Sequence, residues 1–155
     1  MPWEHTLETA ATASVLARHF LKISPDQAFL AGLMHDLGAF YMLYRASQYP
    51  ELKARPDTML YVIVQWHESI GESLAYSLGL PENIIEAIRD HDHPRPPVFH
   101  PKNLTDVLYV ANILSGAVFE WQRKDMDEPE VLRPELNHPA YTELFEEIAL
   151  GKAVS

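Results

Sequence analysis

The chain contains no cysteine and no long apolar run. Without cysteine there is no disulfide framework and no thiolate ligand, so a metal site would need histidines and carboxylates. No apolar stretch approaches the ~18 residues that cross a bilayer, and the N-terminus lacks the basic start and apolar region of a secretory signal. These absences favour a cytoplasmic protein with no membrane association.

Positive charge is also scarce. Lysine and arginine total 12 against 22 aspartate and glutamate residues, which gives a formal net charge of −10. Such a surface repels a phosphate backbone, so a nucleic-acid polymer is not an expected partner. A bound cation could still supply positive charge locally and hold one phosphate group. A nucleotide or another phosphate ester is therefore the small ligand we expect.

Length and hydrophobic periodicity predict one helical domain. With 155 residues and 47% hydrophobic content, the chain can form a single core, and we assign residues 1–155 to one domain. Apolar residues recur at helical spacing, and no strand-like alternation competes with them. The predicted fold is all-α, a bundle of about six to seven helices. The helices are expected over residues 4–21, 24–36, 40–49, 58–67, 68–78 and 80–91, then from residue 103 or 105 to about 123, and over 139–150. The segments 58–67 and 68–78 are expected to meet at residue 67.

Proline and glycine mark the predicted helix ends. Ser24 and Pro25 are typical of a helix start, with serine as the N-cap and proline at the first helical position. Gly38 is expected to take a left-handed conformation that ends or bends a helix, and Gly79 to stop another. Four prolines between residues 94 and 101 exclude a helix there. Residues 124–134 are expected to form an acidic loop.

The most informative stretch is the apolar run 29–38, which ends in His35, Asp36 and a closing glycine. A neutral imidazole beside a carboxylate can bind one divalent ion if further ligands arrive from elsewhere in the fold. His5, His67 and His91 each fall at or near the end of a predicted helical segment. We therefore expect these five side chains to converge in one cleft.

Four blocks of the sequence carry a family resemblance. They are WEHTL at 3–7, FLAGLMHDLG at 29–38, WHESIG at 66–71 and LPENIIEAIRDH at 80–91. In this order they resemble the HDOD family, the HD-related output branch of the HD metal-dependent phosphohydrolase superfamily, and the resemblance extends to about residue 114. It implies an HD-domain-like helical bundle from a bacterial signalling protein, often joined to receiver or cyclic-di-nucleotide modules.

The enzymes of this superfamily imply a set of metal ligands. Those enzymes, including the HD-GYP phosphodiesterases, hold one to three metal ions with a first histidine, a His-Asp pair, further histidines and a final aspartate. The further histidines of the enzymes include an adjacent pair. His91 matches the first position of that pair and Asp92 the second, with His93 as the alternative to Asp92. The implied cofactor is a divalent metal such as Fe, Mn, Mg, Ni or Zn. The other matching ligands are His5, His35, Asp36 and His67.

The sequence departs from the enzymes at three points. Asn112 stands where they place their last metal-binding aspartate, and an uncharged amide oxygen binds a divalent ion only weakly. Asp106 cannot substitute, since its place on the same helix is rotated by ~240° and shifted by ~9 Å along the axis. Ala39 replaces a lysine that meets substrate phosphate in the HD-GYP enzymes, and no Gly-Tyr-Pro loop follows His93.

The start of the chain suggests a further difference. Only four residues precede His5, whereas HDOD domains usually carry another helical lobe ahead of that point. We expect the lobe to be missing, which would leave an apolar face for a second copy or an adjoining domain. The expected partners are other signalling domains or proteins, and a homodimer.

Two functions follow from this pattern. One is a signal-transduction output module with an incomplete HD cleft, which binds metal weakly or remains metal-free. The other is a metal-dependent phosphohydrolase of phosphodiesterase or nucleotidase type, with Asp36, Glu68 and Asp92 as candidate catalytic residues. There, Glu68 or Asp92 would orient the attacking water or a ligand imidazole. The missing carboxylate at Asn112 favours the output module, because catalysis depends on charge placed at the transition state.

Overall fold

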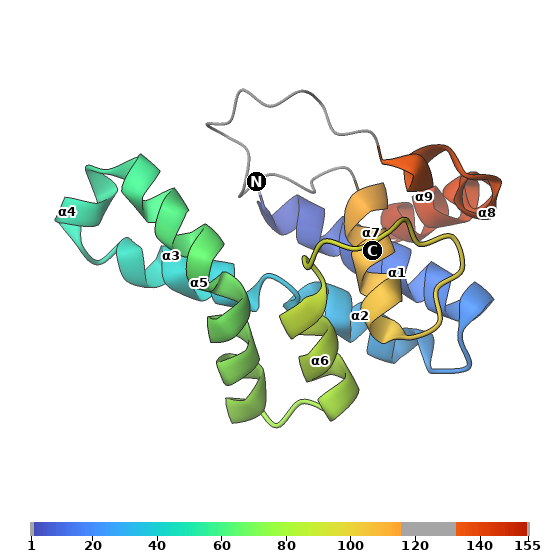
Figure 1. Ribbon diagram of the computed structural model, residues 1–155, viewed down its shortest axis with the longest axis horizontal. Helices are drawn as coiled ribbons and strands as arrows, with labels where there is room; N and C mark the ends of the chain where they lie inside the picture. Colours follow the sequence, from blue (N-terminus) through green and yellow to red (C-terminus); the bar gives the residue numbers. More distant parts are fainter. Residues whose placement is uncertain (1, 116–132, 155) are drawn as a thin grey trace.

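The computed structural model describes residues 2–115 and 133–154. All regular structure in these ranges is helical (Figure 1). Seven of the helices have nine or more residues, so the predicted all-α bundle of about six to seven helices is confirmed. The elements are α1 (Pro2–Phe20), α2 (Pro25–Met34), α3 (Leu37–Ala46), α4 (Pro50–Lys53), α5 (Pro56–Ser77), α6 (Glu82–Asp90), α7 (Leu104–Leu114), the 3-10 helix η1 (Pro134–Asn137), α8 (Pro139–Thr142) and α9 (Phe145–Val154).

The described residues outside 37–66 form the body of the molecule (Figure 1). Helix α1 lies at its centre and packs against α2, α7 and α9. Its buried face is built mostly from alanine and threonine, small residues that let neighbouring helices approach closely. A Cβ atom on Gly32 of α2 would overlap the backbone of Ala10 on α1. This contact sets the separation of the two chain segments that carry His5 and His35.

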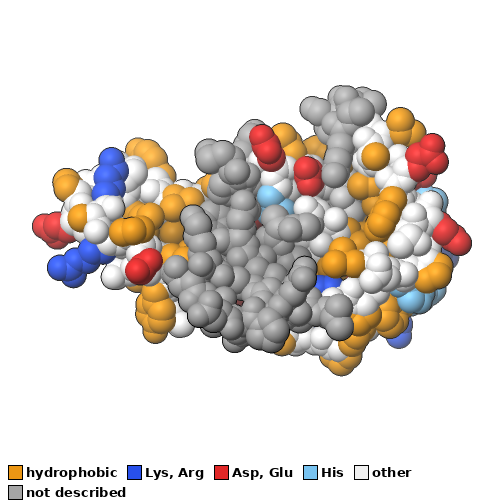
Figure 2. Space-filling model, turned by 90° about the horizontal axis from the view of Figure 1, so that it is seen from above, with side chains coloured by type: hydrophobic (Ala, Val, Ile, Leu, Met, Phe, Trp, Pro, Cys, Tyr) orange, Lys and Arg blue, Asp and Glu red, His pale blue; other side chains and the backbone are white. Residues whose placement is uncertain are grey.

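Helices α3, α4 and the first half of α5, residues 37–66, form an arm that extends from the body (Figure 1). The arm joins the body where α3 packs directly on α5: a Cβ on Gly38 would overlap the carbonyl oxygen of His67 and lie 2.7 Å from the nitrogen of Gly71. Figure 2 shows hydrophobic side chains gathered on the arm. Those that are exposed include Tyr41, Tyr44, Tyr49, Tyr61 and Trp66.

Two features near the site differ from the sequence prediction. Helix α5 is continuous, so His67 lies in its middle and not where two segments meet. No proline or capping residue interrupts positions 67–68, and the helical hydrogen bonds therefore continue. Gly38 lies within α3 and does not take the predicted left-handed conformation. Among the described residues only Gly79, with a φ of 73°, has a positive φ. Gly38 serves close packing on α5, while the predicted stop at Gly79 is confirmed.

The C-terminal segments also differ. The predicted helix over 139–150 is broken into α8 and α9, because Tyr141 is anchored in the core, where its hydroxyl donates to the Val98 carbonyl at 2.5 Å. The connection predicted after residue 49 contains α4. Helix α7 ends at Leu114, and the predictions for residues 116–132, including most of the acidic loop, lie outside the described residues. No helix of the described ranges has the length and hydropathy needed to span a membrane.

Candidate metal centre

Five helical segments meet at one buried cluster. His5 comes from α1, His35 and Asp36 from the α2–α3 junction, His67 from α5 and His91 from the end of α6. The ring centroid of His35 lies 5.5 Å from that of His5 and 5.2 Å from that of His91. The His67 and His91 centroids are 6.4 Å apart. Each of the five residues is at most 5% exposed, so the structure brings the predicted set together out of solvent.

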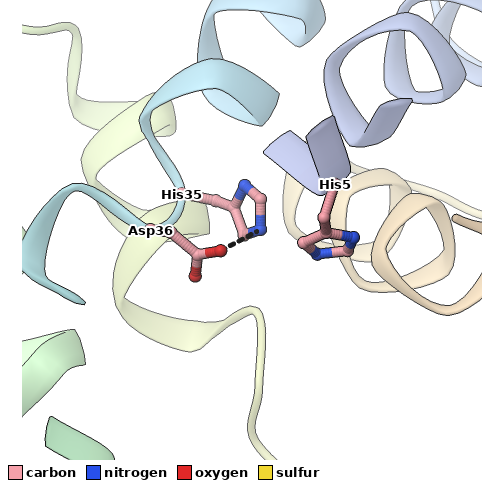
Figure 3. Close-up of side chains that lie close together, drawn as sticks. All are labelled: His5, His35 and Asp36. Carbon is pink, nitrogen blue, oxygen red and sulfur yellow. Dashed lines mark ion pairs between the residues drawn. The ribbon is translucent and has the colours of Figure 1, made fainter. Parts of the chain in front are cut away.

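The cluster contains two groups of three residues. The first group is His5, His35 and Asp36; in Figure 3 the His35 ring and the Asp36 carboxylate lie side by side, and His5 faces them from another helix. His35 Nε2 and Asp36 Oδ2 are 3.1 Å apart. Each residue of the group offers one ligand atom, and all these atoms lie within 4.8 Å of one another.

The second group is His67, His91 and Asp92, and its ligand atoms meet the same 4.8 Å limit. Asp92 Oδ2 lies 3.2 Å from His67 Nε2 and 3.5 Å from His91 Nε2. One carboxylate oxygen therefore sits between two imidazoles.

Three of the histidines present the same nitrogen to the cluster. Nδ1 of His35 is 2.5 Å from the Gly32 carbonyl oxygen, and Nδ1 of His91 is 2.7 Å from that of Ile88. His67 Nδ1 makes the same contact with Ile63 at 2.9 Å. A carbonyl oxygen only accepts hydrogen bonds, so each Nδ1 carries a hydrogen. In the neutral ring this leaves Nε2 with a lone pair, which is the arrangement of a metal-ligating histidine.

Three buried atoms of the cluster contact only other ligand candidates: His35 Nε2 and Asp36 Oδ2 form an ion pair at 3.1 Å, and His91 Nε2 lies 3.5 Å from Asp92 Oδ2. When the imidazoles are neutral, their Nε2 lone pairs face carboxylate oxygens in a buried site, an arrangement that a bound cation would stabilise. Imidazole nitrogens combined with carboxylate oxygens form a donor set for divalent metals. The residues present therefore fit a divalent cation.

The charges of the cluster are balanced internally. Burial acts to raise the pKa of Asp36, but the adjacent His35 imidazole holds that pKa well below its usual range. Burial acts to lower the pKa of His67, but the hydrogen bond and charge of Asp92 raise it to about 9. Without a cation, protons on the imidazoles thus offset the buried carboxylates. A divalent ion would replace those protons.

The family model of the HDOD domain matches residues 2–94, more than half of the chain. The chain belongs to the HDOD family. A curated relative, Ribonuclease Y from Desulfotalea psychrophila, is 30% identical over 115 residues, which cover 74% of this chain and 18% of that protein. A crystal structure from Shewanella amazonensis, named a metal-dependent phosphohydrolase, matches with a TM-score of 0.66 at 17% identity.

The match to the Shewanella structure covers 97% of this chain and 58% of the other. At 17% identity it establishes the helical fold of this HDOD domain and nothing about its chemistry. The chain also spans about a fifth of Ribonuclease Y, since the match covers 18% of that protein.

Asp92, and not His93, faces the histidines of the HDOD domain. The exposed His93 has Nε2 3.7 Å from Glu68 Oε1 and Nδ1 3.6 Å from Asp90 Oδ1. The structure therefore places Asp92 in the second group and His93 at its edge. Glu68 follows His67 on α5, its Oε2 is buried without a hydrogen-bond partner, and burial raises the pKa of its carboxyl.

Two hydroxyl residues that the sequence pattern did not indicate contact His5. Ser115 Oγ, just beyond α7, lies 3.0 Å from His5 Nδ1. Thr9 Oγ1 lies 3.4 Å from His5 Nε2 and 2.9 Å from Ser115 Oγ. Helical spacing could have indicated both, because Thr9 follows His5 by four residues and Ser115 follows Asn112 by three.

Proposed function

We propose that this HDOD domain is an output module of a signalling protein, in which the HD cleft is kept as a scaffold and weak cation site. The observation that carries the proposal is Asn112. This α7 residue faces the histidines with a neutral amide, whose Oδ1 lies 2.7 Å from His5 Nε2. Helix α7 therefore contributes no negative charge at that point to the ligand set.

The residues that could bring positive charge to a phosphate group support the same role. Ala39 is buried and has an uncharged side chain, so its position adds no positive charge. Arg89 donates to both carboxylate oxygens of Asp90, and Arg95 stacks over the Tyr109 ring at 4.4 Å. These arginines are engaged outside the histidine cluster. Hydrolysis of a phosphate ester requires charge that stabilises the transition state, and these positions do not supply it.

The proposed role implies partners. We expect another signalling domain or protein, or a second copy of the chain in a homodimer, at the exposed aromatic residues of the arm. A nucleotide or another phosphate ester is the small ligand that a cation in this cleft would attract. A cytoplasmic location is part of the proposal, because the chain lacks cysteine.

A metal-dependent phosphohydrolase is the second candidate. It is favoured by His35 Nε2, His91 Nε2 and Asp36 Oδ2, buried ligand atoms whose contacts are with other candidate ligands of the cluster. When bound, a divalent cation polarises phosphoryl oxygens and lowers the pKa of a bound water toward ~7. Glu68 and Asp92 would then orient the water or accept its proton.

Metal analysis and a turnover assay separate the two functions. Protein purified without a histidine tag is analysed for metal content and then tested for hydrolysis of bis(4-nitrophenyl) phosphate with added Mn²⁺ or Fe²⁺. We expect the wild type to show no more turnover than His35→Ala. Turnover that is lost in His35→Ala and kept in His19→Ala, an exposed histidine paired with Glu147, would replace the output module with the enzyme.

A further inference from the structure

His5 and Asn112 face each other across the α1–α7 contact, with His5 Nε2 2.7 Å from Asn112 Oδ1. Both residues are buried. The other end of the amide is also engaged, since Asn112 Nδ2 donates to Asp92 Oδ1 at 3.4 Å. Because a carboxylate oxygen accepts hydrogen bonds, this contact directs the NH₂ group toward Asp92 and the amide oxygen toward His5.

That orientation decides which nitrogen of His5 carries a hydrogen. An amide oxygen cannot donate, so the 2.7 Å contact requires His5 Nε2 to be the donor. The opposite nitrogen, Nδ1, lies 3.0 Å from Ser115 Oγ, whose hydroxyl donates to the backbone carbonyl oxygen of Asn112 at 3.0 Å; neither contact changes the donor role of Nε2. His5 therefore differs from His35, His67 and His91, in which Nδ1 holds a hydrogen and Nε2 keeps the lone pair when the ring is neutral.

We propose that His5 and Asn112 form a hydrogen-bonded pair that removes both residues from the metal-ligand set, so that the remaining side chains hold any divalent cation. The inference rests on the proposed function for the retained cation site, and it differs from the ligand roles that the family resemblance implied for His5 and Asn112. The remaining ligands are His35, Asp36, His67, His91 and Asp92.

The pair explains how the first histidine can be kept while its ligand role is lost. A carboxylate at position 112 would compete with Asp92 for positive charge, and a cation between them would satisfy both. The amide instead donates to Asp92 and accepts from His5, so this side of the cluster is satisfied without a cation. Three imidazoles and two carboxylates remain, a donor set that suits Zn²⁺, Fe²⁺ or Ni²⁺ better than Ca²⁺.

The first experiment reads the hydrogen position directly. Long-range ¹H–¹⁵N correlation spectra of the full chain in EDTA distinguish the two neutral histidine forms and the protonated ring. We expect His5 to carry hydrogen on Nε2, and His35, in its neutral form, to carry it on Nδ1. A neutral His5 with hydrogen on Nδ1 alone would overturn the proposal, and this result does not depend on metal binding or on a variant.

The second experiment compares two matched variants by calorimetric titration with Zn²⁺. His5→Gln keeps a donor toward Asn112 but removes the imidazole, and His91→Gln makes the same change in the second group. We expect His5→Gln to alter the zinc affinity by less than about threefold and His91→Gln to lower it about 10-fold to 100-fold. Equal losses would overturn the proposal.

These readouts separate the inference from the function on which it rests. Phosphodiester turnover would overturn the output module and leave the His5–Asn112 pair standing. Thermal unfolding of both variants checks that they fold. If the wild type binds no zinc, the hydrogen position on His5 alone decides.

Discussion

The two groups of the cluster contain the same residue types but differ in the hydrogen-bond partners of their histidines. In the second group, Asp92 Oδ2 lies within 3.5 Å of both imidazoles, and each Nδ1 is bound to a backbone carbonyl. In the first group, His35 follows that pattern, whereas His5 directs Nε2 to the amide of Asn112. If His5 and Asn112 form the proposed pair, hydrogen-bond partners, and not residue type, decide which histidine can serve as a ligand.

The largest expected effect comes from the backbone contact that joins the two groups. Gly38→Ala should lower the free energy of unfolding by about 3 kcal/mol, because the added Cβ would overlap the His67 carbonyl oxygen and push α3 away from α5. Asp36 would then separate from His67, so cation affinity should fall as well. Urea denaturation followed by circular dichroism measures the loss.

Gly71→Ala is the matched control for this contact. The nearest atom to its added Cβ is Ile88 Cγ2 at 3.3 Å, a side-chain atom that can shift, and alanine also favours the helix. We expect a change of less than about 1 kcal/mol. Similar losses in the two variants would show that the contact between Gly38 and His67 does not hold the groups together.

The second effect tests the carboxylate between the imidazoles. Asp92→Asn should lower zinc affinity about 10-fold to 100-fold, since it removes the negative charge between His67 and His91. Asp106→Asn is the control, because Asp106 contacts Lys102 and Arg95 outside the cluster. Isothermal titration calorimetry measures both, and unchanged affinity in Asp92→Asn would exclude the second group as the cation site.

The third prediction concerns Asn112, the neutral residue that contacts His5 of the first group. Asn112→Asp places a second carboxylate where the amide now donates to Asp92, at 3.4 Å. We expect zinc affinity to rise about tenfold, and the free energy of unfolding in EDTA to fall by about 1 kcal/mol, because only a cation relieves the repulsion. Asn83→Asp, on the surface beside Gln27, should do neither. An unchanged affinity would mean that Asn112 does not limit the site.

The smallest effect lies outside both groups and gives a reference for pH dependence. Tyr141→Phe should cost about 1 kcal/mol through loss of the hydrogen bond to the Val98 carbonyl. Burial raises the pKa of Tyr141, so the folded protein keeps the phenol protonated where the unfolded chain ionises, above pH ~10. Its contribution to stability is complete below that pH and declines above it.

Urea denaturation in EDTA between about pH 8 and pH 11 measures this contribution, over a range that brackets the ordinary tyrosine pKa. The wild type should lose stability more steeply than Tyr141→Phe. If the two proteins show the same dependence, the alkaline loss comes from other groups.

Local signals predicted much of the fold. Ser24 caps α2 with a hydrogen bond to the Asp26 N–H at 3.1 Å, and Gly79 ends α5, because both effects depend on a few adjacent residues. The role of Gly38 could not be predicted in the same way. Its lack of a side chain matters only because His67, far along the chain, packs against it.

The sequence by itself determined most of the helices and the HDOD family. The orientation of three histidines is also set locally, since each Nδ1 bonds a carbonyl three or four residues earlier on its own helical segment. Only the tertiary structure decided the state of His5. Its partner Asn112 is 107 residues away, and their contact exists because α1 packs on α7. A local hydrogen bond follows from spacing, whereas one between distant segments follows from packing.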